Sequence, residues 1–305
     1  MTLQTLPFRL VDVFAHEPLS GNGLSVFLLD DDLPRVVMQS ITQEMRQFET
    51  IFLQRTNQPS KFNARIFTME EELSFAGHPV IGAAAVLHSE SFLTEDEVHL
   101  EFVIHDRSIN VTSRRQGESY IVEMGQGCAT VAPPIPPERN EIFLKALNLS
   151  ITDLAPELPL QVVSTGLPYL IVPIASNLEH ARIVAPDFEA LLATVGAKFV
   201  YVLEINDFEG RTWENDGSVE DIATGSAAGP AAVYLVTHGC APVGDTLVLA
   251  QGRFLHRPSK LYATVQAGSE LNVTLEGQVC LVGSGTLRLP NKLLRPDASK
   301  AGATE

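Results

Sequence analysis

Alternating and continuous apolar runs dominate the first half of the chain. Residues 62–69 alternate apolar and polar side chains, as a half-buried strand does. Residues 8–14 and 24–30 are apolar and rich in β-prone residue types. Further strand-like segments follow near residues 98–104, 108–113 and 119–124. The pattern predicts a strand-rich first half.

One helix is predicted within this half. Pro34 follows Asp31 and Asp32, which suits a helix start. Apolar residues then recur at steps of three and four, which places them on one helix face: Val37, Met38, Ile41, Met45 and Phe48. Glu49 lies where this pattern ends and the next strand-like segment begins.

Four prolines lie in residues 131–140, and proline cannot join the ladder of a central strand. We therefore predict a linker or crossing loop that separates a domain of residues 1–130 from one of residues 131–284. A segment near 285–300 is expected to pack back on the first domain. The end of the chain, residues 292–305, is expected to be frayed.

The second half mixes helices and strands. Its pattern predicts helices near 138–148 and 187–195 and strands near 161–165, 169–174 and 198–205.

An internal repeat links the two halves. Residues 72–87 and 220–235 align so that Glu72 corresponds to Glu220 and Gly77 to Gly225. Each copy is a glycine turn that opens into a helix of mostly Ala, Val and Gly. Such a helix has no polar face and belongs inside a domain, wrapped by a sheet. The predicted fold class is α+β, with two similar domains that each place a strand-rich wall around a buried helix.

Charge and composition exclude several classes of function. The chain has 21 Lys and Arg against 37 Asp and Glu, a formal charge of −16, which repels phosphate backbones and anionic lipids. Nucleic-acid and membrane partners are therefore not expected, and no apolar run reaches the length of a membrane-spanning helix. Three widely separated cysteines and the lack of a signal-peptide pattern favour a cytoplasmic protein. Zinc and nucleotide-phosphate motifs are missing, so no metal is expected.

The two glycine turns are candidate anion sites. A helix N-terminus leaves about four backbone N–H groups unpaired and carries a partial positive charge. Glycine lets a ligand approach that backbone closely. If residues 76–79 and 223–229 face each other, they can hold one carboxylate while a proton leaves the neighbouring carbon. The alternative is that each turn is only the tight entry to a buried helix.

Five segments together resemble the PhzF-like family, the relatives of the phenazine-biosynthesis isomerase, within the diaminopimelate epimerase-like fold. They occur in family order and span most of the chain: DVFAHEPLSGNGLSVF (12–27), MQSITQEMRQFETIFL (38–53), FTMEEELSFAGHPVIGAA (67–84), EDIATGSAAG (220–229) and GRFLHRPSKL (252–261). The resemblance implies two pseudo-symmetric domains, each a barrel-like sheet around a central helix, with the site in the cleft between them. It also implies a homodimer that uses neither a metal nor an organic cofactor.

The resemblance also assigns roles to residues. The family's catalytic glutamate corresponds to Glu49, its Gly-His-Pro histidine to His78, and the Asp and Ser of its second glycine segment to Asp221 and Ser226. Each of the last three has an alternative interpretation. His78 would be a structural histidine, and Asp221 and Ser226 would be helix caps. Backbone N–H groups at the two turns, led by Gly77 and Gly225, would bind the substrate.

The sequence differs from the family pattern at three positions, and these differences bear on the identity of the substrate more than on the type of reaction. Gly23 follows Asn22 where the family has proline, and Ile222 also replaces a proline. Phe48 precedes the glutamate where serine is usual, which would favour a less polar substrate.

The predicted function is a cofactor-independent isomerase that moves a proton on a small carboxylate, with Glu49 as general acid and base and with His78 and Asp221 as further catalytic residues. Two alternatives stay open at this point. One is an epimerase or tautomerase on the same fold, and the other is a non-catalytic protein that binds small carboxylates.

Overall fold

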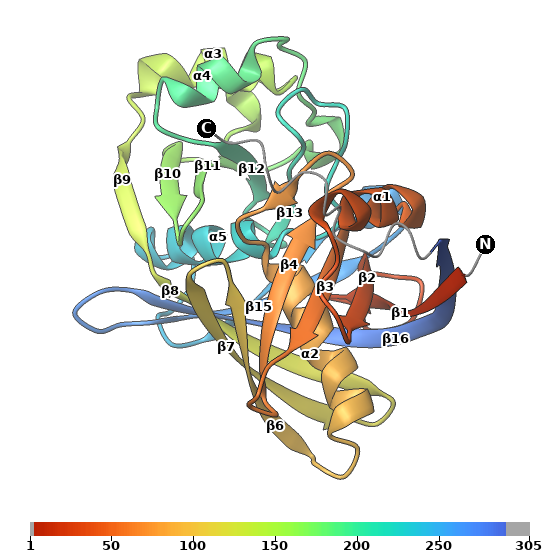
Figure 1. Ribbon diagram of the computed structural model, residues 1–305. Coiled ribbons are helices and arrows are strands. Elements are labelled where there is room, and N and C mark those ends of the chain that lie inside the picture. Colours follow the sequence, from red (N-terminus) through yellow and green to blue (C-terminus); the bar gives the residue numbers. More distant parts are fainter. Residues whose placement is uncertain (1–2, 291–305) are drawn as a thin grey trace, which may run out of the picture. The chain divides into compact units, whose positions relative to one another are not determined.

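The computed structural model describes residues 3–290 of the 305-residue chain (Figure 1). The chain forms two compact units. Of the described residues, the first unit contains 3–13, 23–122 and 279–290, and the second contains Phe14–Asn22 and Glu123–Gln278. Two long strands have residues in both units, because β8 and β16 each continue through a division point.

The first unit is a closed ring of strands. The strands follow one another in the order β1-β2-β3-β4-β6-β7-β8-β16, β16 also pairs with β1, and the short β5 pairs with β4. Their bounds are β1 (Leu3–Val13), β2 (Asn22–Leu29), β3 (Glu49–Arg55), β4 (Lys61–Phe67), β5 (Glu72–Leu73), β6 (Glu97–Ile104), β7 (Arg107–Gln116), β8 (Ser119–Cys128) and β16 (Asn272–Pro290).

Helix α2 (Gly77–Ser91) is the core of this unit, where it packs against β1, β3, β6 and β7 (Figure 1). Every residue from Gly77 to His88 is buried. The small side chains let the strands approach closely: a β-carbon added at Gly82 would lie 2.5 Å from Cδ2 of Leu24. Helix α1 (Arg35–Met45) instead lies over a separate apolar cluster that includes Phe27 and Phe52.

The second unit likewise packs a run of strands around a buried helix. Its strands follow the order β16-β15-β14-β13-β12-β11-β10-β9. Their bounds are β9 (Thr130–Pro134), β10 (Gln161–Ser164), β11 (Pro168–Ile174), β12 (Phe199–Glu204), β13 (Glu209–Arg211), β14 (Thr246–Gln251) and β15 (Ser259–Gln266). Helix α5 (Gly225–Thr237) packs against β10, β11, β12, β14 and β15.

The sheet of the second unit has an apolar layer on each side. Leu170 and Val172 of β11 join the cluster under helices α3 (Asn140–Ala146) and α4 (Phe188–Ala193). Tyr169 points to the opposite side, where its hydroxyl meets α5. Figure 1 shows α3 and α4 on one side of β10–β12 and α5 on the other. Short 3-10 helices complete the unit: η1 (Pro137–Arg139), η2 (Ile151–Asp153), η3 (Leu178–His180) and η4 (Arg253–Leu255).

Most predicted elements are confirmed, including the helix after Pro34, the strands of both halves and the two buried alanine-rich helices. The prediction that residues 131–140 form a linker or crossing loop is wrong. Residues 130–134 form β9, which pairs with β10, and η1 follows directly. Proline is compatible with this position because β9 is the last strand in the sheet order, and one of its sides has no ladder partner among residues 3–290.

The predicted domain limits, 1–130 and 131–284, differ from the compact units of the structure. The units divide between Val122 and Glu123, and the second unit also takes in residues 14–22. Residues 285–290 continue β16 and pair with the start of β1, from Phe8↔Gly285 to Leu3↔Pro290. The expectations for residues 291–300 and for a frayed end at 292–305 lie outside the described residues.

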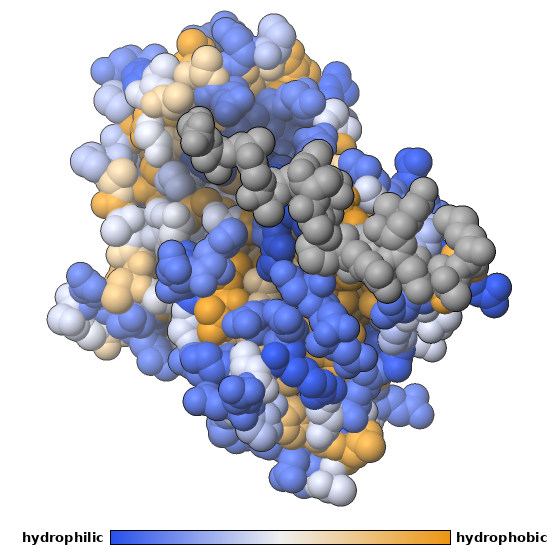
Figure 2. Space-filling model, in the orientation of Figure 1, coloured by the Kyte–Doolittle hydropathy of each residue, from blue (hydrophilic) through white to orange (hydrophobic). Residues whose placement is uncertain are grey.

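Hydrophilic residues cover much of the molecular face in Figure 2, with hydrophobic residues scattered between them. Exposed apolar side chains are scattered: Val36 lies on α1, Leu93 in the loop after α2, and Ile142 on α3.

Candidate active site

Glu49 and His78 form a buried acid–imidazole pair in the first unit. Glu49 is the first residue of β3 and is aligned with Leu24 of β2, whose side chain reaches α2. His78 is the second residue of α2, and its Nε2 lies 2.8 Å from Oε2 of Glu49. The exposed fractions are 6% for Glu49 and 5% for His78. The two atoms lie close enough for proton transfer in a place largely shielded from water, although their contact does not have hydrogen-bond geometry.

The chain conformation before β3 helps to direct Glu49 inward. Helix α1 ends at Arg46, which adopts the left-handed conformation with φ of 58° and donates its N–H to the carbonyl of Thr42. Two residues separate this turn from Glu49. The strand then begins at once, so that the alternation of β3 points Glu49 and Ile51 to the α2 side.

Both alanine-rich helices begin with an open first turn. Among residues 3–290, no side chain caps the start of α2 or α5, and neither helix has an acidic residue in its first turn. The first helical residues, Gly77 and Gly225, are buried. At Gly225 a β-carbon would lie 3.1 Å from Cδ2 of Leu275 and 3.2 Å from Cζ of Phe14, so a side chain does not fit there without movement.

Asp221 is held by a network at the start of α5. Its Oδ2 accepts a hydrogen bond from the Thr224 hydroxyl at 2.5 Å. Its Oδ1 accepts from Nδ2 of Asn22 at 2.9 Å and from the N–H of Ala223 at 3.3 Å. Gln251 closes the network, because its Nε2 donates to the carbonyl of Asp221 and to the hydroxyl oxygen of Thr224. Asp221 therefore orders the turn before the helix without capping the helix itself.

Ser226 has a phenolic partner. Its hydroxyl lies 2.7 Å from that of Tyr169, and either oxygen is able to donate. Tyr169 is buried and its ring lies against Phe199, with ring centroids 5.5 Å apart. The Ser226 hydroxyl thus has a fixed place at the second residue of α5.

Each helix start is preceded by a glutamate in an arginine fork, and the two glutamates are the matched positions of the repeat. Arg65 donates from Nε and Nη2 to both carboxylate oxygens of Glu72, at 2.7 and 2.8 Å. Arg211 does the same to Glu220, at 2.8 and 2.5 Å. Hydrogen bonds from Arg65 hold the pKa of Glu72 below its usual range. Paired N–H···O bonds of this kind fix geometry as well as charge.

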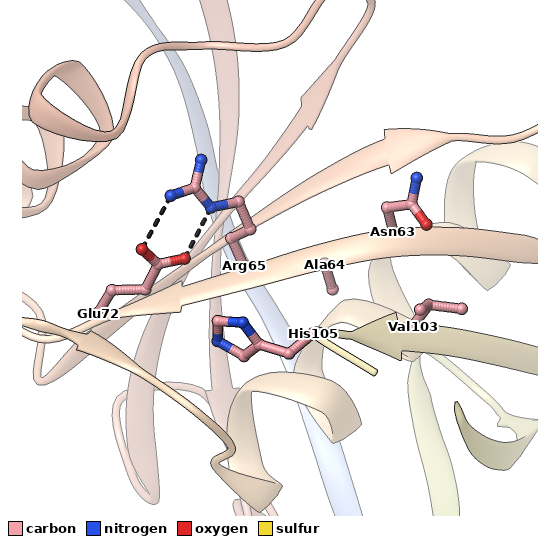
Figure 3. A pocket seen from close by; sticks show the side chains of 6 residues that line it. All are labelled: Asn63, Ala64, Arg65, Glu72, Val103 and His105. Atoms are coloured by element: carbon pink, nitrogen blue, oxygen red, sulfur yellow. Dashed lines mark hydrogen bonds and ion pairs between the residues drawn. The ribbon is translucent and has the colours of Figure 1, made fainter. Parts of the chain in front are cut away.

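A hollow of about 360 Å³ lies beside the first fork (Figure 3). It is lined by Asn63, Ala64, Arg65, Glu72, Val103 and His105. None of the predicted site residues lines this hollow. The arginine of the hollow, Arg65, is already engaged with Glu72.

The structure thus brings Glu49, His78 and Gly77 together in the first unit, and Asp221, Gly225 and Ser226 together in the second. Sequence reasoning missed Asn22, Thr224 and Tyr169, which contact the second group. Thr224 lies within residues 223–229, which the sequence predicts as an anion site. Asn22 lies in the segment Gly21-Asn22-Gly23, where the family has Gly-Asn-Pro. The sequence around Tyr169 has no motif that indicates a functional residue.

Residues 3–290 contain neither a cluster of metal-ligating side chains nor a helix that could span a membrane. Within residues 3–290, no group of three or more His, Cys, Asp or Glu side chains is placed to hold a metal ion. Among the helices of the same residues, none has the length and hydrophobicity needed to cross a membrane.

Comparison with known proteins identifies the family. The family model of phenazine biosynthesis-like proteins matches residues 11–285. The trans-2,3-dihydro-3-hydroxyanthranilate isomerase of Pseudomonas fluorescens is 33% identical over 92% of this chain and 99% of its own length. A solved structure of a predicted epimerase from Pseudomonas aeruginosa is 46% identical, with a TM-score of 0.84, and covers 92% of this chain and 99% of its own.

A more distant structural neighbour extends the fold relationship. The hydroxyproline epimerase of Agrobacterium vitis has a TM-score of 0.60 at 11% identity, over 94% of this chain and 92% of its own. This likeness supports the diaminopimelate epimerase-like fold with two similar strand-rich domains, each around a central helix. With the family model matching most of the chain and with named isomerases among its relatives, the chain belongs to the PhzF-like, phenazine biosynthesis-like family and is an isomerase.

Proposed function

We propose that this isomerase moves a proton on a small carboxylic acid without a cofactor, and that Glu49 carries the proton. The observation that carries the proposal is the buried contact of 2.8 Å between Glu49 and His78 at the start of α2. A carboxyl group in such a place is able to take a proton from an activated carbon and return it to another. His78 keeps the carboxyl group oriented through both steps.

The helix starts supply the complementary half of the chemistry. Backbone N–H groups at Gly77–His78 and at Gly225–Ser226 bind the substrate carboxylate, and Asp221 orients a polar group of the substrate. When the neighbouring carbon loses its proton, negative charge spreads onto the carboxylate oxygens. Preorganised donors and the positive end of a helix dipole stabilise that charge. The open first turns of α2 and α5 support these roles.

The substrate is proposed to be less polar than that of the named relatives. Those relatives act on trans-2,3-dihydro-3-hydroxyanthranilate. Here Phe48, which is half-buried, directly precedes Glu49, so the hydroxyl of the serine usual at this position is replaced by an aromatic ring. Phe48→Ser is expected to raise kcat/KM on trans-2,3-dihydro-3-hydroxyanthranilate, measured by absorbance or NMR. An unchanged or lower value contradicts this part of the proposal.

Epimerisation is the second candidate function, because the 46% identical structure is that of a predicted epimerase. Turnover in heavy water separates the two. Isomerisation places solvent deuterium on a carbon other than the one that lost the proton, whereas epimerisation places it on the same carbon with inversion. Binding of carboxylates with no exchange at any carbon would contradict both and favour a non-catalytic binding protein. We further propose a cytoplasmic homodimer, on the strength of the family.

A further inference from the structure

Residues 14–22 form an excursion of the N-terminal sequence into the second unit. The chain leaves β1 after Val13 and re-enters the first unit at Gly23. The excursion begins with a backbone conformation that non-glycine residues rarely adopt, with φ of 61° at Phe14. Leu19 repeats this conformation with φ of 70°. Such strain persists only where surrounding contacts determine it, which directs attention to what the excursion delivers.

Arg257 anchors the end of the excursion. Its Nε donates to the carbonyl of Gly21 at 2.7 Å, and its Nη2 donates to that of Ser20 at 2.8 Å. The N–H of Gly21 in turn donates to the carbonyl of Pro258 at 3.3 Å. These three bonds fix the backbone immediately before Asn22.

The side chain of Asn22 meets the turn before α5. Asn22 is fully buried, and its Nδ2 donates to Oδ1 of Asp221 at 2.9 Å and to the carbonyl of Ala223 at 3.1 Å. The side-chain NH2 group of Asn22 thus donates two hydrogen bonds, one to a carboxylate oxygen and one to a backbone carbonyl oxygen. The amide orientation is therefore fixed by its partners. Together with the donors from Thr224 and Ala223, Asn22 restricts the orientation of the Asp221 carboxylate.

We infer that Asn22 is a positioning residue for the reaction, which holds the Asp221 carboxylate in one orientation at the start of α5. This inference rests on the proposed role of Asp221 in orienting the substrate. Asn22 acts through Asp221 and through the Ala223 carbonyl, which together fix the turn. The excursion of residues 14–22 then has a functional reason, since it brings an amide donor to the Asp221 carboxylate.

Asn22→Asp tests the inference most severely. The change keeps the size of the side chain but turns a donor into a second carboxylate facing Asp221. We expect kcat to fall about 100-fold with a much smaller change in KM, in line with the loss of a charge-assisted hydrogen bond and added repulsion. Asn22→Ala removes the donor without adding charge and is expected to lower kcat about 10-fold. If Asn22→Asp does not fold, the kcat and KM of Asn22→Ala test the inference instead.

The exchange variant Asn22→Asp/Asp221→Asn separates positioning from simple structural support. An amide and a carboxylate again face each other, so the melting temperature is expected to return toward that of the wild type. The carboxylate now stands at position 22, so kcat is expected to stay as low as in Asn22→Asp. If the exchange restores kcat together with stability, Asn22 is only a structural tie and the inference is overturned.

Two further variants complete the design. Asn215→Asp is the matched control, because Asn215 also donates from Nδ2 to a carbonyl in the second unit, that of Lys198 at 2.9 Å. Its kcat is expected to be unchanged. Asp221→Asn alone is expected to lower kcat strongly. Full activity of Asp221→Asn overturns the positioning inference while leaving Glu49 as the proton carrier, whereas full activity of Glu49→Gln overturns the proposed function itself.

Discussion

The starts of α2 and α5 share a scaffold but differ in the side chains they assemble. Both begin with a buried glycine, and both follow a glutamate held in an arginine fork. The start of α2 adds an acid–imidazole pair, Glu49 and His78, whereas the start of α5 adds a carboxylate already tied to amide and hydroxyl donors. The two starts therefore offer different chemistry: a buried carboxyl group beside an imidazole at α2, and a carboxylate with fixed hydrogen-bond partners at α5.

Substitution of His78 is expected to have the largest effect among the tests of this comparison. His78→Asn removes the imidazole that contacts Glu49, and we expect kcat to fall about 100-fold to 1,000-fold because general acid–base catalysis contributes factors of this size. KM is expected to change little. Steady-state kinetics measure both.

The matched control is His88→Asn on the same helix. His88 is fully buried and contacts Ser113 and the carbonyl of Glu95, so its substitution is expected to lower the melting temperature and leave kcat unchanged. Equal losses of kcat in the two variants would mean that His78 supports the helix and takes no part in the chemistry.

The two arginine forks are expected to differ in stability. Arg211 is buried, and beyond Glu220 its Nη1 donates to three carbonyls, those of residues 178, 179 and 181. Arg211→Met leaves Glu220 buried without its partner and is expected to cost about 3–5 kcal/mol of unfolding free energy. Arg65→Met is expected to cost only about 1 kcal/mol, because Arg65 is about one-third exposed and Glu72 keeps a bond from Arg35.

Urea denaturation of both variants measures this difference. Equal losses in the two variants would contradict the claim that burial separates the forks.

The smallest expected effect is a pH dependence of stability at the first fork. Hydrogen bonds from Arg65 and Arg35 lower the pKa of Glu72 in the folded state from its ordinary value of 4.5. A lowered folded-state pKa stabilises the protein above the unfolded pKa, and that stabilisation is lost as pH falls through the folded value. Glu72→Gln should therefore lose less stability than the wild type as the pH falls below about 4.5.

Denaturation at a series of acid pH values tests this prediction, with Arg65→Met/Glu72→Gln as the control that lacks the fork. Parallel pH curves for the wild type and Glu72→Gln would show that Glu72 contributes nothing to acid stability.

Local patterns were sufficient to predict the elements that this comparison uses. The repeat gave the two buried helices, because a run of Ala, Val and Gly without a polar face has no stable place on a surface. The sequence motif around Glu49 predicted a site residue at this position. In the structure its carboxyl group lies beside the imidazole of His78. The glycines could be predicted as helix starts because the same turn occurs twice.

Contacts between distant parts of the chain could not be predicted. Asn22 meets Asp221 across 199 positions of sequence, through an excursion that only the folded backbone defines. Tyr169 reaches Ser226 because strand alternation points it to the α5 side, and nothing in its local sequence distinguishes it from other buried aromatics. The prolines at 133 and 134 were misinterpreted because an edge strand and a loop tolerate proline equally well.

The most direct test of the account is the behaviour of Glu49→Gln in turnover and in binding. The amide keeps the shape of the side chain but does not carry a proton to carbon. Glu97→Gln, at the exposed first residue of β6, is the control. The account predicts that Glu49→Gln loses turnover and deuterium exchange by at least about 1,000-fold while the substrate Kd by calorimetry stays within a few-fold of the wild type. Normal turnover by Glu49→Gln would contradict the account.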